Sequence, residues 1–202
     1  MSASTFSRQL AETRSLLGRN LDLYQIHSAT VESGVLQDRE LLDDLAELQS
    51  EGVAVGLTVT GPEQPATIEQ ALEVGLFDTV QATWNLLERS AEPALEAAHA
   101  AGLGVIVKEA VANGRLTASA APPELATAAA ELGASSDALA IAAALARPWA
   151  ANVLSGAATV EQLMSNLTAF EIDYDQRLDR RLAPLAEDPD AYWRTRAALP
   201  WN

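Results

Sequence analysis

Short apolar stretches alternate with longer amphipathic ones along most of this chain. Leu41, Leu42, Leu45 and Leu48 follow the spacing of a helix that packs one face against a sheet. Directly after them, residues 53–59 form a nearly continuous, Val-rich apolar run, as buried parallel strands do. The whole pattern predicts strands at residues 21–28, 53–59, 77–83, 104–109 and 151–155, and helices at residues 5–17, 38–49, 66–74, 90–101, 122–132, 136–146 and 159–170.

Small polar residues mark where several of these helices begin. Ser90, Ser136 and Thr159 precede helical runs and are predicted to be N-caps, because their side-chain oxygens can accept hydrogen bonds from free backbone amides. The last stretch, residues 171–202, is predicted to be a C-terminal tail that is helical over residues 174–182 and irregular after them.

The regular alternation of strand and helix predicts an α/β fold with a parallel sheet and right-handed connections. The pattern alone is compatible with an open doubly wound sheet and with a (β/α) barrel. Residues 1–202 are expected to form a single domain, since the 202-residue chain is 49% hydrophobic and can bury a core of its own.

Composition narrows the possible functions. The net charge of −15 argues against nucleic acid as a partner, because phosphate neutralisation requires clustered cations. No signal peptide and no apolar run long enough to span a membrane are evident, so we expect a cytoplasmic protein without a membrane partner. The chain has no cysteine, and no cluster with the spacing of metal ligands is visible.

Polar residues stand at the carboxyl ends of all five predicted strands. Because these ends lie on one face of a parallel sheet, they are expected to form a binding site. His27 is the most informative of them, since a histidine that follows an apolar strand is well placed for catalysis. The other candidates at these ends are Thr58, Gln81 with Asn85 in the loop after it, Lys108 and Ser155.

The turn after the last strand is a candidate anion site. Gly156, Ala157 and Thr159 are small, so the backbone amides at the start of the next helix can approach a phosphate closely. Gln162 and Asn166 are four residues apart on that helix and share a face. They either hydrogen-bond an adenosine or face water.

Lys108 is the only lysine of the chain and is followed directly by Glu109. A lysine at a strand end can act as a general base or form a Schiff base. The alternative is that it closes a loop through a salt bridge.

Four separated stretches resemble the aldo-keto reductase family. Residues 22–28 are similar to the fourth strand of that family with its catalytic histidine, and residues 77–88 to its sixth strand. Residues 104–107 and 112–117 are similar to its seventh strand and the following loop. Residues 155–157, 160–163 and 166–167 are similar to the eighth βα unit, which holds the 2′-phosphate and adenine of NADPH.

The resemblance implies a TIM-type (β/α) barrel, here an incomplete one of about five βα units. It implies hydride transfer from NADPH, or NADH, to a small carbonyl substrate. His27 is then the catalytic histidine. The implied cofactor-binding residues are Thr58, Gln81, Lys108, Ser155, Gly156, Ala157, Thr159, Gln162 and Asn166. The basic residue that the family often places near the 2′-phosphate has no counterpart at Ala157-Ala158-Thr159.

The family also uses an Asp, a Tyr and a Lys, which belong to its first three βα units. This chain shows no counterpart of those units, so the resemblance implies an N-terminally truncated domain that is weak or inactive on its own. Two sheet edges would then lack a neighbour. Either a second copy or another partner covers them, or the chain rearranges, or it is marginally stable. The alternatives are a non-catalytic, partner-dependent nucleotide-binding subunit, or a different enzyme that uses Lys108 and Glu109.

Overall fold

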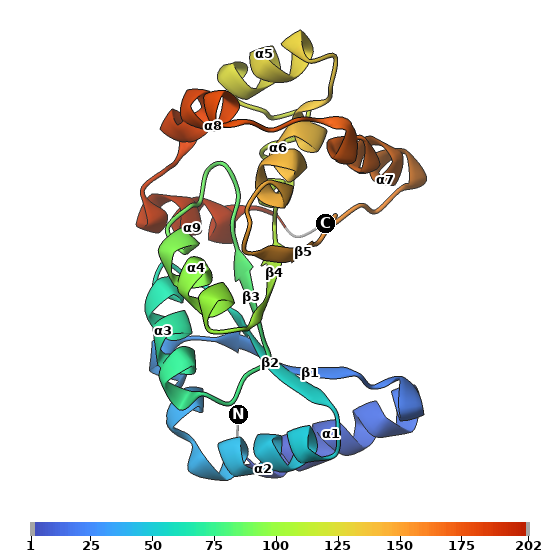
Figure 1. Cartoon of the computed structure of the whole chain (residues 1–202), viewed down its shortest axis with the longest axis vertical. Coiled ribbons are helices and arrows are strands. Elements are labelled where there is room, and N and C mark those ends of the chain that lie inside the picture. The colour runs from blue at the N-terminus through green and yellow to red at the C-terminus, as the bar shows by residue number, and fades with distance from the viewer. Residues whose placement is uncertain (1–2, 201–202) are drawn as a thin grey trace. The chain divides into compact units, whose positions relative to one another are not determined.

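The computed structural model describes residues 3–200, which divide into two compact units (Figure 1). Of the described residues, the N-terminal unit comprises 3–81 and 93–105, and the C-terminal unit comprises 82–92 and 106–200.

The strands and helices follow one another in the predicted order. The first part of the chain forms α1 (Ala3–Leu17), β1 (Leu23–Ala29), α2 (Arg39–Ser50), β2 (Ala54–Val59), α3 (Gln64–Val74), β3 (Thr79–Thr83), α4 (Glu92–Ala100) and β4 (Gly104–Lys108). The second part forms α5 (Pro123–Glu131), α6 (Ser136–Leu145), β5 (Ala150–Val153), α7 (Val160–Leu167), α8 (Gln176–Leu182) and α9 (Pro189–Ala198).

The five strands form one sheet in the order β1-β2-β3-β4-β5. β1 pairs with β2 and β2 with β3, both in parallel. Neighbouring strands are joined through helices, as parallel pairing requires. The predicted α/β class with a parallel sheet and five βα units is therefore confirmed.

In the N-terminal unit, the core lies where α2 covers the sheet. Leu41, Leu45 and Leu48 are buried, as their helical spacing predicts. Val55 and Leu57 of β2 are fully buried as well. Asp38 caps α2 by accepting a hydrogen bond from the Leu41 amide at 3.2 Å, which fixes where this helix begins.

Gly56 lies where three strands of the N-terminal unit leave no room for a side chain. It is in register with Gln25 on β1 and with Thr79 on β3. Gln25 Nε2 donates a hydrogen bond to Thr79 Oγ1 (3.3 Å), and a Cβ added to Gly56 would come within 2.1 Å of that oxygen. Glycine is therefore required here by close packing.

We expect Gly56→Ala to lower the free energy of unfolding by about 1–3 kcal/mol, because the added methyl must push Thr79 and Gln25 apart. Thermal melts will measure this loss. Gly104→Ala is the matched control: its Cβ would meet the nearest atom, Thr79 Cγ2, at an ordinary 3.5 Å. Equal stability of the two variants would contradict this packing argument.

In the C-terminal unit, α6 is the central helix. Nearly all of its residues are buried, among them Leu139 and Ile141. Trp84 and Trp149 meet edge to face with ring centroids 5.8 Å apart.

No single helix among residues 3–200 is long and apolar enough to cross a membrane. Taken together, α5 and α6 reach the length and apolar composition of a membrane span, but the two helices meet at an angle of 87°.

Three sequence-based expectations about helices are wrong. Ser90 is not the N-cap of α4, because this helix begins at Glu92 and the Ser90 hydroxyl donates to Glu88 Oε1. Ser135, not Ser136, is the N-cap of α6: Ser135 Oγ accepts from the Ala138 amide at 3.2 Å, and Ser136 is the first helical residue. The end of the tail is helical as well. Asp188 accepts from the Ala191 amide (3.0 Å) and Pro189 occupies the first turn, so α9 forms where an irregular segment is predicted.

Glu88, in the C-terminal unit, is a buried carboxyl. Its Oε1 accepts hydrogen bonds from the backbone and hydroxyl groups of Ser90, whereas Oε2 has no partner within residues 3–200. Burial raises the pKa of Glu88, and repulsion from the carboxylates of Glu187 and Asp188 raises it further. The hydrogen bonds from Ser90 lower this pKa but do not cancel the effect of burial. The ionised form is thus less favourable in the folded state than in the unfolded one.

A carboxyl whose pKa is raised on folding binds more protons when folded, so its contribution to stability declines as the pH rises through that pKa. We therefore expect the stability of the wild type to fall, relative to Glu88→Gln, as the pH rises above 4.5, the ordinary pKa of a glutamate. Denaturant titrations at several pH values will test this. A difference that is constant with pH would show that Glu88 titrates normally.

Candidate functional site

His27 lies in an irregularity at the carboxyl end of β1. The β1–β2 register shifts between Ile26 and Ala29, so two residues of β1, His27 and Ser28, lie opposite one residue of β2, Thr58. Ser28 adopts a left-handed φ of 54°, which is costly for a non-glycine residue and is found mostly at functional sites. The bulge leaves His27 exposed, and its Nδ1 is 3.0 Å from Ser28 Oγ.

Thr58 and Gln81, two further predicted site residues, are neighbours in the N-terminal unit. They are register partners on β2 and β3. Thr58 is buried and its Oγ1 accepts from the Ser28 amide at 3.3 Å, so it supports the bulge that carries His27. Gln81 is half-buried. The three predicted residues of this unit thus lie at consecutive strand ends.

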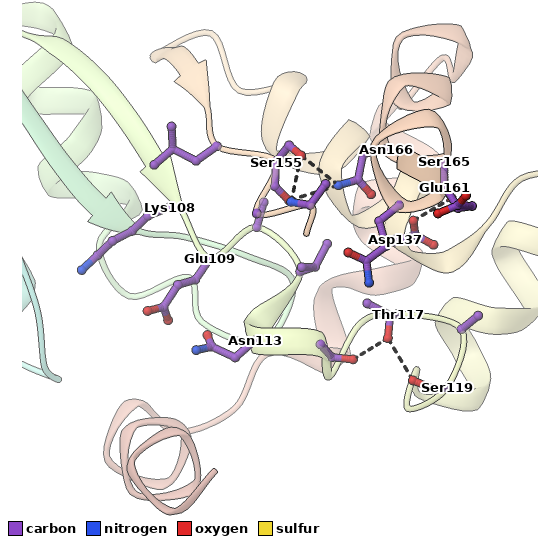
Figure 2. Close-up of a pocket in the computed structure, with 18 residues that line it drawn as sticks. Lys108, Glu109, Asn113, Thr117, Ser119, Asp137, Ser155, Glu161, Ser165 and Asn166 are labelled. Carbon is purple, nitrogen blue, oxygen red and sulfur yellow. Dashed lines mark hydrogen bonds between the residues drawn. The ribbon is translucent and has the colours of Figure 1, made fainter. Parts of the chain in front are cut away.

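A cavity of about 770 Å³ lies in the C-terminal unit (Figure 2). Its wall begins at the end of β4 with Lys108 and Glu109 and continues through the loop after them. The opposite wall consists of the turn at residues 154–157 and one side of α7, and Asp137 of α6 contributes to it. Six of the predicted cofactor-binding residues line this cavity: Lys108, Ser155, Gly156, Ala157, Gln162 and Asn166.

The turn before α7 is held by the chain's own side chains. Ser155 Oγ accepts from the Ala157 amide (3.1 Å), and Gln162 Oε1 accepts from the amides of Ala158 (2.7 Å) and Thr159 (3.2 Å). Thr159 Oγ1 in turn accepts from the Gln162 amide (3.2 Å), which completes a capping box. Thr159 is therefore the N-cap, as predicted, and Gln162, although exposed, binds this turn.

Asn166 is buried and ties α7 to the same turn. Its Nδ2 donates to the carbonyl oxygen of Ser155 (3.0 Å) and to Ser155 Oγ (3.1 Å). Its Oδ1 has no partner among the described residues. Ser165 donates to Asp137 Oδ2 (2.7 Å) beside it, so polar groups of α6 and α7 meet at this end of the cavity (Figure 2).

Lys108 and Glu109 differ in their surroundings. The Lys108 ammonium has no hydrogen bond or ion pair with any residue of 3–200, so it does not close a loop by a salt bridge. Burial lowers the pKa of Lys108. The negative charge of Glu109 acts in the opposite direction and raises this pKa, whereas the positive charge of Arg196 lowers it further. Glu109, with a left-handed φ of 57°, lies beyond the end of β4 and forms an ion pair with Arg196 (2.6 Å).

Asn85, proposed from its place after the third strand, is a structural residue. It is fully buried, and its side chain makes four hydrogen bonds within the C-terminal unit. Sequence reasoning also missed two cavity residues, Asp137 and Glu161. Their only sequence signal is a place in the first turn of a helix, where acids are common for electrostatic reasons alone.

No group of three His, Cys, Asp or Glu side chains able to hold a metal ion occurs within residues 3–200.

Comparisons with known proteins give one family and one fold. A sequence model of the aldo/keto reductase family matches residues 1–178, and no curated protein matches the chain. The apo form of aldo-keto reductase AKR11C1 from Bacillus halodurans superposes with a TM-score of 0.74 at 21% identity, covering 93% of this chain and 70% of that one. The holo form of the same protein superposes with a TM-score of 0.73 at 22% identity, covering 93% of this chain and 68% of that one.

The thermostable aldo-keto reductase Tm1743, solved with the inhibitor epalrestat, gives a TM-score of 0.73 at 23% identity, with 91% of this chain and 67% of that chain covered. At these identities the similarity is one of fold.

Proposed function

Because this chain belongs to the aldo/keto reductase family, we propose that it serves NAD(P)H-dependent reduction of a small carbonyl compound and that the cavity of its C-terminal unit holds the nucleotide. The observation that carries the proposal is the gathering of six predicted cofactor-binding residues around one cavity.

The cavity suits a nucleoside by size and by chemistry. Its volume of about 770 Å³ lies within the usual range for small-molecule sites. Asn166 Oδ1, which has no partner among residues 3–200, is a free acceptor for an exocyclic amine such as that of adenine. The residues present therefore fit the adenosine portion of a dinucleotide.

His27 is proposed to act on the carbonyl oxygen. The bound cofactor supplies the hydride. If His27 Nδ1 accepts from the neighbouring Ser28 hydroxyl, then Nε2 carries the proton of the neutral ring and can donate it in a hydrogen bond to that oxygen. The chain offers no evident counterpart of the family's tyrosine, so we expect slow turnover, since a positioned general acid contributes roughly 10²–10⁴-fold in rate.

A second candidate is a nucleotide-binding subunit that works only with a partner. The outer face of α7 favours it: Val160, Leu163, Met164 and Leu167 form a stripe at helical spacing, and each is at least 44% exposed. A stripe of this kind is typical of a surface that another chain covers. β5, the strand that precedes α7 in the chain, is also an edge strand of the sheet. Activity that appears only with a partner would favour this candidate.

Thermal melts with and without nucleotide test the proposal. A ligand that binds only the folded state raises its stability by about 2.7 kcal/mol at a hundred times its Kd. We expect NADH or NADPH to raise the midpoint. Ala157→Trp, which fills the cavity, should abolish the shift, whereas Ala158→Trp, at an exposed position outside the cavity lining, should retain it. No shift in the wild type would overturn the proposal.

A further inference from the structure

The end of the cavity formed by α6 and α7 carries negative charge without a cation. Glu161 and Asp137 lie there, and Lys108, the only basic residue in the lining, is at the opposite side (Figure 2). Glu109 is neutralised by Arg196 and contributes little net charge. A dianionic phosphate at the α7 end would therefore face carboxylates without any compensating positive charge.

The backbone amides at the start of α7 do not compensate for the missing cation. A helix N-terminus binds phosphate through amides that have no other partner. Here the amides of Ala157, Ala158 and Thr159 already donate to the side chains of Ser155 and Gln162. A phosphate could reach them only by displacing the Gln162 side chain and with it the capping box.

Glu161 is suited to a hydroxyl group instead. Hydrogen bonds from its own backbone amide and from the Thr159 hydroxyl lower the pKa of its carboxyl, which therefore stays ionised. An ionised carboxylate only accepts hydrogen bonds. In Rossmann-type dinucleotide sites an Asp or Glu side chain accepts from the ribose 2′-hydroxyl of NAD, whereas an arginine accommodates the 2′-phosphate of NADP, and the same chemistry applies to a carboxylate in this cavity.

We propose that this cavity selects a dinucleotide with a free ribose 2′-hydroxyl, NADH, over its 2′-phosphorylated form, and that Glu161 accepts a hydrogen bond from that hydroxyl. The inference rests on the proposed function, because it assigns the ligand of the same cavity. It departs from the NADPH that the family resemblance puts first.

Isothermal titration calorimetry with four probes tests the selectivity: NADH, NADPH, 5′-AMP and 2′,5′-ADP, all at one ionic strength. For the wild type we expect NADH to bind at least about tenfold more tightly than NADPH, a difference of about 1.4 kcal/mol. The two mononucleotides differ only in the 2′-phosphate, so they isolate its effect. We expect 5′-AMP, which has a free 2′-hydroxyl, to bind more tightly than 2′,5′-ADP.

Variants at Glu161 assign the effect to its charge. Glu161→Gln should reduce the preference for NADH over NADPH, measured as the ratio of their two Kd values. Glu161→Arg should reverse this preference. Glu124→Arg makes the same change of charge in the first turn of α5, outside the cavity, and should leave the ratio unchanged. Far-UV circular dichroism and melting of each variant will show that the fold is kept.

The outcomes separate the two proposals. NADPH binding as tightly as NADH to the wild type, or an unchanged ratio in a folded Glu161→Arg variant, would overturn the selectivity and leave the nucleotide site intact. Binding of none of the four probes would overturn both.

Discussion

Replacement of Asn85 by alanine is expected to lower the free energy of unfolding by roughly 3–5 kcal/mol, because each buried polar group left without a partner costs about 1–3 kcal/mol. Asn85 Nδ2 donates to the carbonyl oxygen of Glu109 and to the hydroxyl of Tyr192, both at 3.0 Å. Its Oδ1 accepts from the amides of Leu87 (2.9 Å) and Glu88 (3.0 Å). All these groups lie in or near the core of the C-terminal unit.

Urea denaturation followed by tryptophan fluorescence will measure the loss. Tyr192→Phe is the matched control: it removes only the hydrogen bond between Asn85 and the phenol, and should cost about 1 kcal/mol. If Asn85→Ala unfolds no more easily than Tyr192→Phe, the turn at residues 85–88 does not depend on the Asn85 side chain.

Arg147→Met is expected to cost about 2–4 kcal/mol, because it leaves two carboxylates without their central cation. Arg147 Nη1 donates to Glu92 (3.1 Å), Nη2 to Asp179, and the guanidinium lies 4.6 Å from the centroid of the Trp84 ring. Methionine keeps the apolar stem of the side chain, so the loss measures the charged head. Lysine should restore little, since it cannot bind both carboxylates in a planar fork.

The pH dependence distinguishes this ion network from simple loss of packing. Burial alone would raise the pKa of Asp179, but the hydrogen bond and charge of Arg147, with those of Arg89, hold it below its ordinary value. Stability from such a carboxyl is present above its unfolded pKa and is lost as the pH falls through the lower folded pKa. The wild type should therefore lose stability below about pH 4 more steeply than Arg147→Met; parallel curves would contradict the network.

The sequence predicted the parallel sheet because buried strands leave a strong local signal. Two local patterns each indicate a surface that must be buried: the apolar run at residues 53–59 and the leucine spacing of residues 41–48. In the structure, β2 is buried along most of its length and the leucine face of α2 is buried as well. α9 was missed although Asp188 and Pro189 are a normal helix start. Pro184 and Pro200 flank this stretch, and its burial depends on partners far away in the sequence.

The candidate site was predictable only in part, for a related reason. Asn85 looked like a ligand-binding residue because its partner Tyr192 is 107 positions away, and no local pattern shows that contact. Gln162 and Asn166 were placed correctly on one helix, yet hydrogen bonds to the turn before α7 occupy much of their capacity. The roles of His27, Thr58 and Gln81 stay predictions, as do the cytoplasmic location, the single domain and a partner for the sheet edges.

Hydrogen–deuterium exchange of the whole chain, with and without saturating NADH, tests most directly whether the cavity of the C-terminal unit is a nucleotide site. We predict slower exchange in peptides that cover residues 108–119 and 154–166, which contain most of the cavity lining, and no change in α2. NADH that leaves both segments unprotected, or that protects only segments elsewhere, would contradict the account.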